Sequence, residues 1–195
     1  MVDAGDLGNR KTESLRSTLV QVAAELASNP RTIKLPTMRE LAKKAGVAPG
    51  AAYRHFASQD DLYIEVIRFL FDELEQSLNE AITGLSKPEA QLKKFAQAYV
   101  NWGLSNPGSY QLLFETTDEI DMPLPNERPG LHLITQLAAL LSKDLKPNKA
   151  STQSAIQLWV SLHGLISLRL HKTGMNWQNS VEKDVDQLIK TFWAR

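Results

Sequence analysis

Apolar residues recur at the period of an α-helix along most of the 195-residue chain. The first such stretch spans residues 10–28 and ends at Asn29-Pro30. Its apolar stripe has spacings of four, three and four and consists of Leu15, Leu19, Val22 and Leu26. No stretch alternates apolar and polar residues between hairpin turns, as paired β-strands would. The pattern therefore predicts an all-α fold.

Two short helices are predicted next, from the residues that would begin and end them. Thr37 is a good N-cap, and Glu40 three positions later completes a capping-box pattern. Gly46 is suited to the left-handed conformation that ends a helix. The second short helix would start at Pro49. Proline has no N–H to donate, and the N–H of a first helical residue has no partner within the helix, so nothing is lost there.

A long helix is predicted from Ser58, a capping residue followed by Asp60 and Asp61, to about residue 83. Apolar residues cover more than one of its sides, so it should pack against more than one neighbour. Five further helices are expected: one with Leu92, Phe95, Tyr99 and Trp102; one with Tyr110, Leu113 and Phe114; one with Leu131, Ile134, Ala138, Leu141 and Leu145; and residues 149–172 and 179–193. Residues 115–130 are predicted to form an acidic loop. The predicted helices number about nine in total.

Charge is unevenly distributed, although the formal net charge is zero. Residues 10–59 contain nine Lys or Arg and three acids, a net charge of +6, whereas residues 60–195 have a net charge of −4. A window of 50 residues can reach such a value by chance. A basic N-terminal segment nevertheless indicates a negatively charged partner such as DNA.

Composition removes several classes of protein. The chain has no cysteine, which excludes disulfides, thiolate zinc sites and cysteine nucleophiles. The first six residues are acidic and polar, unlike a secretory signal, and the longest unbroken apolar run, Leu137–Leu141, has only five residues. We therefore expect a cytoplasmic protein that contacts no membrane and uses no cofactor.

Residues 37–62 have the pattern of a helix-turn-helix unit. Two short helices that cross steeply need small residues at their contact, which Ala42 and Ala45 supply, and Gly46 suits the tight turn. The residues expected to face inward are Leu41, Val47, Ala52 and Phe56. The outer side of the second helix would then be free to enter the major groove of DNA.

This segment resembles the DNA-binding domain of the TetR/AcrR family of bacterial transcriptional regulators. The matching features, within residues 10–62, are the first helix, Thr37, Ala42, Gly46-Val47, Tyr53-Arg54-His55-Phe56, and Ser58 followed by two acids and Leu62. Further along, Trp159, His163 and Gly164 resemble the family's Trp-His-Gly type of C-terminal domain. The resemblance implies a three-helix DNA-binding domain at residues 1–57 and a helical ligand-binding and dimerisation domain at residues 58–195.

The resemblance also implies roles for individual residues. Thr37, Tyr53 and His55 would bind phosphates, which sets the register on DNA without reading its sequence. Arg39 would reach a guanine edge or a phosphate. The groove-facing side of the second motif helix would consist of Pro49, Gly50, Ala51 and Arg54.

Two residues depart from the family's pattern. Ala48 stands where the family has a capping Ser or Thr, which removes a side-chain cap that contributes about 0.5–2 kcal/mol. Gln59 stands where the family has a phosphate-binding Lys. One ionic contact fewer lowers the expected slope of log affinity against log salt by about one.

The small residues of the second motif helix imply how DNA would be read. Pro49, Gly50 and Ala51 offer no side-chain hydrogen bonds, so polar readout would fall on Arg39 and Arg54, with thymine methyls contacted by alanine. We therefore expect much of the specificity to come from DNA shape, with Arg10 or Lys11 near a minor groove.

Other residues with chemical potential have plainer explanations. Asp60 and Asp61 fit the first turn of a helix better than a catalytic pair, because acids there oppose the positive end of the helix dipole. His163 and His171 are eight residues apart on one predicted helix, too far to share a metal ion. No metal site and no enzymatic activity are therefore expected.

The C-terminal two thirds offer candidates for a ligand pocket and a dimer surface. The pocket candidates are aromatic residues and one histidine, for each of which core packing is the plainer explanation, although together they could line a pocket: Phe95, Tyr99, Trp102, Tyr110, Phe114, Trp159 and His163. The helix at residues 149–172 is apolar on too many sides for one neighbour to cover. It and the final helix are expected to pair with a second copy of the chain.

The predicted function is a one-component transcriptional regulator. It would bind a near-palindromic operator as a homodimer and be released by a small, mostly apolar ligand acting through the helix that starts at Ser58. The alternative is an all-α enzyme, or a module that binds a small molecule or lipid, with an incidental basic head. The sequence leaves open the ligand, the operator, and whether binding represses or activates transcription.

Overall fold

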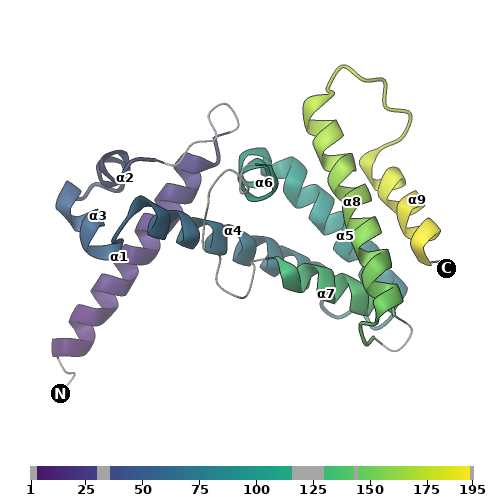
Figure 1. Ribbon diagram of the computed structural model, residues 1–195, viewed down its shortest axis with the longest axis horizontal. Coiled ribbons are helices and arrows are strands. Elements are labelled where there is room, and N and C mark those ends of the chain that lie inside the picture. The colour runs from purple at the N-terminus through teal and green to yellow at the C-terminus, as the bar shows by residue number, and fades with distance from the viewer. Residues whose placement is uncertain (1–3, 30–35, 116–129, 143–144, 194–195) are drawn as a thin grey trace. The chain divides into compact units, whose positions relative to one another are not determined.

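The computed structural model describes residues 4–29, 36–115, 130–142 and 145–193. Within these ranges the chain is all-α, which confirms the predicted fold class, and it contains no strand (Figure 1). The nine helices of these ranges are α1 (Ala4–Ala27), α2 (Met38–Ala45), α3 (Pro49–His55), α4 (Gln59–Ile82), α5 (Pro88–Ser105), α6 (Pro107–Phe114), α7 (Leu131–Leu140), α8 (Lys149–His171) and α9 (Val181–Trp193).

The chain forms two compact units. The first comprises Met1–Leu70 together with Gly108–Leu124, and the second comprises Phe71–Pro107 together with Pro125–Arg195. The division falls inside α4, whereas the predicted boundary between functional domains lies just before that helix. That boundary stays a prediction about function.

In the first unit, α1 packs against α2, and three of its five buried residues are alanines. Its buried residues are Leu19, Val20, Ala23, Ala24 and Ala27. Of the predicted stripe only Leu19 is fully buried, while Leu15, Val22 and Leu26 are half-buried. The buried face is therefore turned toward the alanines, which allow a neighbouring helix to approach closely.

The end of α1 lies directly against the start of α6. A Cβ atom added to Gly108 would lie 1.7 Å from the carbonyl oxygen of Ser28, so only glycine fits at this position. Beside it, the Ser109 hydroxyl donates to the Ser28 hydroxyl across 2.8 Å. Gly108, Ser109 and Tyr110 are all buried. The unit that contains the motif helices thus includes a helix from the middle of the sequence.

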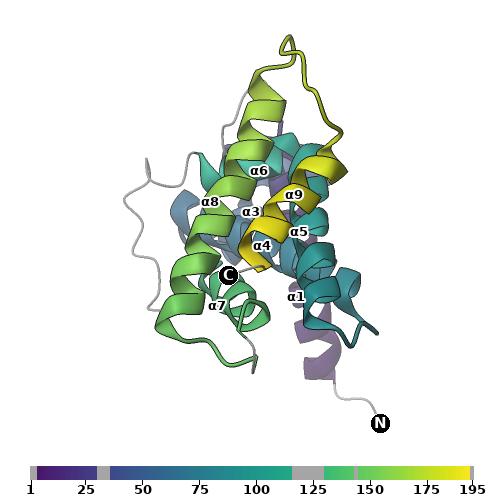
Figure 2. The same ribbon diagram turned by 90° about the vertical axis from the view of Figure 1, so that its right-hand side faces the viewer.

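In the second unit, α5 lies among α7, α8 and α9 and packs against each of them (Figure 2). Its buried residues recur every three to four positions, as the predicted stripe did, and are Leu92, Phe95, Ala96, Tyr99, Val100 and Gly103. The facing helices contribute Ala155, Leu158, Leu162 and Ile166 from α8 and Val185 and Ile189 from α9.

The predicted apolar stripe of α7 is wrong. The helix ends at Leu140, and its buried residues are Leu133, Leu137, Ala138 and Leu140. Of the five predicted stripe residues only Ala138 is buried, and Leu131 and Leu145 are 59% and 48% exposed. Leucines surround most of this short helix, so their spacing did not identify the buried side.

Candidate functional site

The start of α2 has the predicted capping box. The Thr37 hydroxyl accepts a hydrogen bond from the backbone N–H of Glu40 across 3.3 Å, and the Glu40 carboxylate accepts one from the Thr37 N–H across 2.8 Å. The helix ends at Gly46, which has a φ of 70°. A residue with a side chain is strained at this positive φ, which explains why a glycine makes the tight turn between α2 and α3. Both local predictions are confirmed.

The Thr37 hydroxyl already has a partner for its single proton. Its Oγ1 atom lies 2.8 Å from Glu40 Oε2, to which it donates. A DNA phosphate would have to compete with this carboxylate for the proton, and the negative charge of Glu40 would lie close to that phosphate. The predicted phosphate contact of Thr37 therefore requires its hydroxyl to turn away from Glu40.

Helix α3 presents part of its predicted DNA-facing side to solvent. It begins at Pro49 after Ala48, which makes no side-chain cap, as the sequence predicted. Pro49, Gly50, Tyr53 and Arg54 are exposed, with Tyr53 at 63%, and His55 is half-buried.

Ala51, predicted to lie on the groove-facing side, is largely buried, and its contact with DNA stays a prediction. Ala51 is only 7% exposed and packs inward beside the fully buried Ala52. Two consecutive residues of a helix can both lie at the edge of its buried side, because they are only 100° apart around the axis. Only a small part of the Ala51 side chain is accessible to a thymine methyl in this conformation.

A brace centred on Arg16 joins α1, α3 and α4 within the first unit. Arg16 Nη1 lies 3.1 Å from Glu65 Oε2, and its guanidinium carbon lies 5.1 Å from the ring centre of Phe56, the residue that ends α3. Arg68 also contacts Glu65, across 3.0 Å. The hydrogen bond from Arg16 is the main cause of a lowered pKa for the Glu65 carboxyl.

Sequence reasoning missed this brace and counted Arg16 only as one of the basic residues. Arg16 in α1 and Glu65 in α4 are 49 residues apart in the sequence, and no local pattern connects them. The brace leaves fewer unpaired cations for an anionic partner than the count of basic residues implied.

Four exposed cations of the first unit have no ion-pair partner among the described residues: Arg39, Lys43, Lys44 and Arg54. Lys43 and Lys44, which were not predicted as site residues, occupy the last turn of α2. The side chains of Arg10 and Lys11, predicted to lie near a minor groove, fall outside the described part of the chain.

The predicted pocket residues are divided between the two units. In the second unit, Trp159 Nε1 donates to the Tyr99 hydroxyl across 3.0 Å, and the Trp159 and His163 rings lie 5.7 Å apart. Burial raises the pKa of Tyr99, while the bond from Trp159 acts in the opposite direction. Phe95 is also buried, and Trp102 is half-buried. These contacts are those of a packed core.

The remaining two candidates, Tyr110 and Phe114, belong to α6 in the first unit. Tyr110 is fully buried, and its ring centre lies 5.1 Å from that of Phe114. In the described residues, both side chains are therefore part of the aromatic packing of the first unit.

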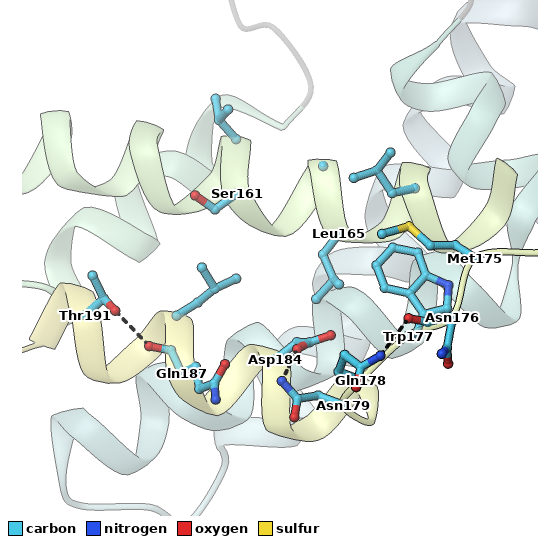
Figure 3. A pocket seen from close by; sticks show the side chains of 14 residues that line it. Ser161, Leu165, Met175, Asn176, Trp177, Gln178, Asn179, Asp184, Gln187 and Thr191 are labelled. Atoms are coloured by element: carbon cyan, nitrogen blue, oxygen red, sulfur yellow. Dashed lines mark hydrogen bonds between the residues drawn. The ribbon is translucent and has the colours of Figure 1, made fainter. Parts of the chain in front are cut away.

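A groove of about 700 Å³ lies between α8 and α9 in the second unit (Figure 3). It contains none of the predicted pocket residues and is lined by Val160, Ser161, Gly164, Leu165, Leu168, Met175, Asn176, Trp177, Gln178, Asn179, Asp184, Gln187, Leu188 and Thr191. Val160, Leu168 and Met175 are 57%, 48% and 55% exposed. Such a surface leaves apolar area in water.

The loop between α8 and α9 is fastened by Arg169. Its Nη2 atom donates to the carbonyl oxygen of Asn179 across 2.9 Å and to Asp184 Oδ2 across 2.6 Å. Its guanidinium carbon lies 4.1 Å from the ring centre of Trp177. Asn179 also donates to Asp184, across 3.1 Å. Trp177, Asn179 and Asp184, which Arg169 contacts, are also lining residues of the groove.

Two further kinds of site are absent from the described ranges. No three His, Cys, Asp or Glu side chains there come together as a metal site would need. None of the described helices combines the length and the apolar character needed to cross a bilayer.

Comparison with family models identifies the chain. A model described as "Bacterial regulatory proteins, tetR family" matches residues 36–66, which include the helix-turn-helix. A second, described as "Tetracyclin repressor-like, C-terminal domain", matches residues 92–192, just over half of the chain. The chain belongs to the TetR family of transcriptional regulators. The Trp-His-Gly subtype is not named by either description and stays a prediction for this TetR family member.

Solved structures share the fold at low identity. A protein of unknown function from Rhodococcus sp. RHA1 is 21% identical, with a TM-score of 0.73 over 92% of this chain and 94% of its own. A TetR family member from Streptomyces coelicolor is also 21% identical, with a TM-score of 0.67 over 91% and 97% of the two chains. The multidrug binding protein EbrR, solved with imidazole, is 21% identical, with a TM-score of 0.62 over 91% and 88%.

Proposed function

We propose that this TetR family regulator binds a near-palindromic operator as a homodimer and represses transcription until a small, mostly apolar ligand releases it. The observation that supports DNA binding most directly is the exposed outer side of α3. Pro49, Gly50, Tyr53 and Arg54 are accessible there, beside a turn held by Gly46. A single exposed helix of this kind fits the width of the major groove.

Base recognition would fall on two arginines. Arg39 in α2 and Arg54 in α3 are exposed and have no ion-pair partner in the described part of the chain. Arginine pairs bidentately with a guanine edge, and such a pair discriminates between bases by about 1–3 kcal/mol. Because Ala51 is buried, even less of α3 remains for direct reading than the sequence implied. DNA shape would therefore supply much of the specificity.

A second copy of the chain would cover the groove between α8 and α9. One helix-turn-helix reaches only one half-site, so useful affinity needs two. Val160, Leu168 and Met175 provide exposed apolar surface on the groove. A Cβ atom on Gly164 would meet nothing within 4 Å, so its own subunit does not require this glycine. A helix of the second copy could approach closely there.

A ligand in the second unit would act through α4, which begins in the first unit and ends in the second. It can change DNA affinity only if it binds two conformations unequally, with a coupling typically of about 1–3 kcal/mol. The aromatic residues of α5 and α8 pack against one another, so a ligand would have to separate them, and their apolar character would then favour an apolar ligand. EbrR, a fold relative, is described as a multidrug binding protein. No catalytic step is part of the proposal, and such a regulator would work in the cytoplasm, where bacterial DNA lies.

The experiment that tests this function is a gel shift with the DNA upstream of the chain's own coding sequence, at two salt concentrations. We expect specific binding that weakens at higher salt, because phosphate contacts release counterions. Arg54→Ala should weaken specific binding at least tenfold, with Lys172→Ala, an exposed cation of the second unit, as the matched control. Equal binding by wild type and Arg54→Ala would refute the assigned surface.

A further inference from the structure

The N-termini of α2 and α4 are linked by one side chain. Gln59, the first residue of α4, donates from Nε2 to the carbonyl oxygen of Pro36 across 3.3 Å. Pro36 is buried and immediately precedes Thr37, the N-cap of α2. The two residues are 23 positions apart, so the contact ties together two separate parts of the first unit.

The peptide bond between Pro36 and Thr37 is held from both sides. Its N–H donates to Glu40 Oε2 across 2.8 Å, within α2, and its carbonyl oxygen accepts from Gln59 of α4. A peptide unit is planar, so fixing both groups fixes its orientation. The contact with α4 therefore fixes the direction in which α2 starts. It also fixes the position of Arg39, two residues after Thr37.

The start of α4 is itself well fixed, which makes it a firm support. The Asp61 N–H donates to the Ser58 hydroxyl across 3.0 Å, and the Ala57 N–H donates to Asp61 Oδ2 across 3.1 Å. These two bonds fix the turn at the start of α4, around residue 59. The amide of Gln59 therefore projects from an ordered turn toward the Pro36 carbonyl.

We infer that Gln59 is a positioning residue for DNA binding: it holds the N-terminal end of α2, with Arg39, in the orientation that DNA requires. It does so as a neutral donor within the protein and supplies no charge to a phosphate. This inference rests on the proposed DNA-binding function.

The contact itself is tested without DNA. Gln59→Met keeps the length of the side chain but removes the donor, whereas Gln59→Lys keeps a donor that can reach the same carbonyl. Loss of one neutral hydrogen bond should raise hydrogen exchange at the amides of Glu40 and Leu41 by roughly two- to tenfold in Gln59→Met. Both amides bond to Thr37, across 3.3 and 2.9 Å. Gln59→Lys should exchange as the wild type does.

The functional role is tested by operator affinity in a double-mutant cycle with Arg39→Ala. If Gln59 acts by placing Arg39, Gln59→Met should weaken binding several-fold in the wild type and have little further effect in Arg39→Ala. The slope of log affinity against log salt should stay unchanged in Gln59→Met. In Gln59→Lys it should steepen by about 0.9 if the lysine neutralises one additional phosphate.

Three outcomes would overturn the inference. Unchanged exchange in Gln59→Met would show that the contact does not hold α2. Additive effects with Arg39→Ala would show that Gln59 acts on DNA independently, for instance through its own amide on a phosphate. Equal affinity of Gln59→Met and wild type would show that the position of α2 is fixed by other contacts. If the wild type binds no DNA at all, the proposed function fails instead. The exchange measurement still decides whether the contact between Gln59 and Pro36 holds α2.

Discussion

Gly108→Ala should destabilise the protein, even though alanine is the better helix former. A Cβ atom at position 108 would lie 1.7 Å from the Ser28 carbonyl oxygen and 2.3 Å from its carbonyl carbon, both backbone atoms at the end of α1. Backbone cannot rotate out of the way as a side chain can, so α1 and α6 must separate. Overpacking of a buried contact typically costs about 1–3 kcal/mol.

The helix propensity of alanine offsets part of this cost. Alanine in place of glycine inside a helix contributes about 0.5–1 kcal/mol. The separation also strains the hydrogen bond between the Ser109 and Ser28 hydroxyls, which contributes a further 0.5–1.5 kcal/mol or so. The net loss should be on the order of 1–3 kcal/mol. For a chain of this size, about 1 kcal/mol shifts the melting temperature by roughly 2–4 °C.

The assay is thermal unfolding followed by circular dichroism at one fixed protein concentration, because dimerisation would make the melting temperature depend on concentration. Gly50→Ala is the matched control: this glycine also lies in a helix, and a Cβ atom there meets nothing within 4 Å. It should melt at or slightly above the wild-type temperature. If Gly108→Ala melted at the same temperature as Gly50→Ala, the close contact between α1 and α6 would be refuted.

Three further predictions concern charge and association. Glu40→Gln keeps an acceptor for the Thr37 N–H but removes a negative charge beside the predicted phosphate contact, so operator affinity in a gel shift should rise; an unchanged or lower affinity would argue against a phosphate at Thr37. The lowered pKa of Glu65 means that its stabilising pairing with Arg16 is present above the carboxyl's unfolded-state pKa and is lost as the pH falls through its folded value. Arg16→Met should therefore show a shallower loss of stability than the wild type below about pH 4.5, and because Arg16 is partly exposed the difference should stay below about 1 kcal/mol. Val160→Asp should give monomers by sedimentation at micromolar concentration, whereas Leu131→Asp, at an equally exposed apolar residue of α7, should leave the association state of the wild type.

Local features of the fold could be predicted because their residues are neighbours in the sequence. The Thr37–Glu40 capping box and the left-handed Gly46 both lie within one turn of a helix end, where residue type determines conformation. The absence of a side-chain cap at Ala48, the N-cap residue of α3, was predictable for the same reason.

Features that depend on tertiary contacts could not be predicted. Arg16 and Glu65, and Ser28 and Ser109, meet across 49 and 81 residues, and nothing in their immediate sequence marks them as partners. The side on which Ala51 lies depends on how α3 sits in its unit, and a 100° step around a helix can turn an alanine from outside to inside. The Gln59 contact was hidden because residue type alone does not show whether an amide faces its own backbone or a partner.

The inclusion of α6 in the first unit means that this unit is not a continuous stretch of chain. A fragment ending at residue 57 or 70 would leave the end of α1 without the helix that covers it. A chimera that joins the helix-turn-helix part of this chain to the C-terminal domain of another regulator would therefore also have to include residues 107–114. In this protein, the part that would touch DNA is not an interchangeable module.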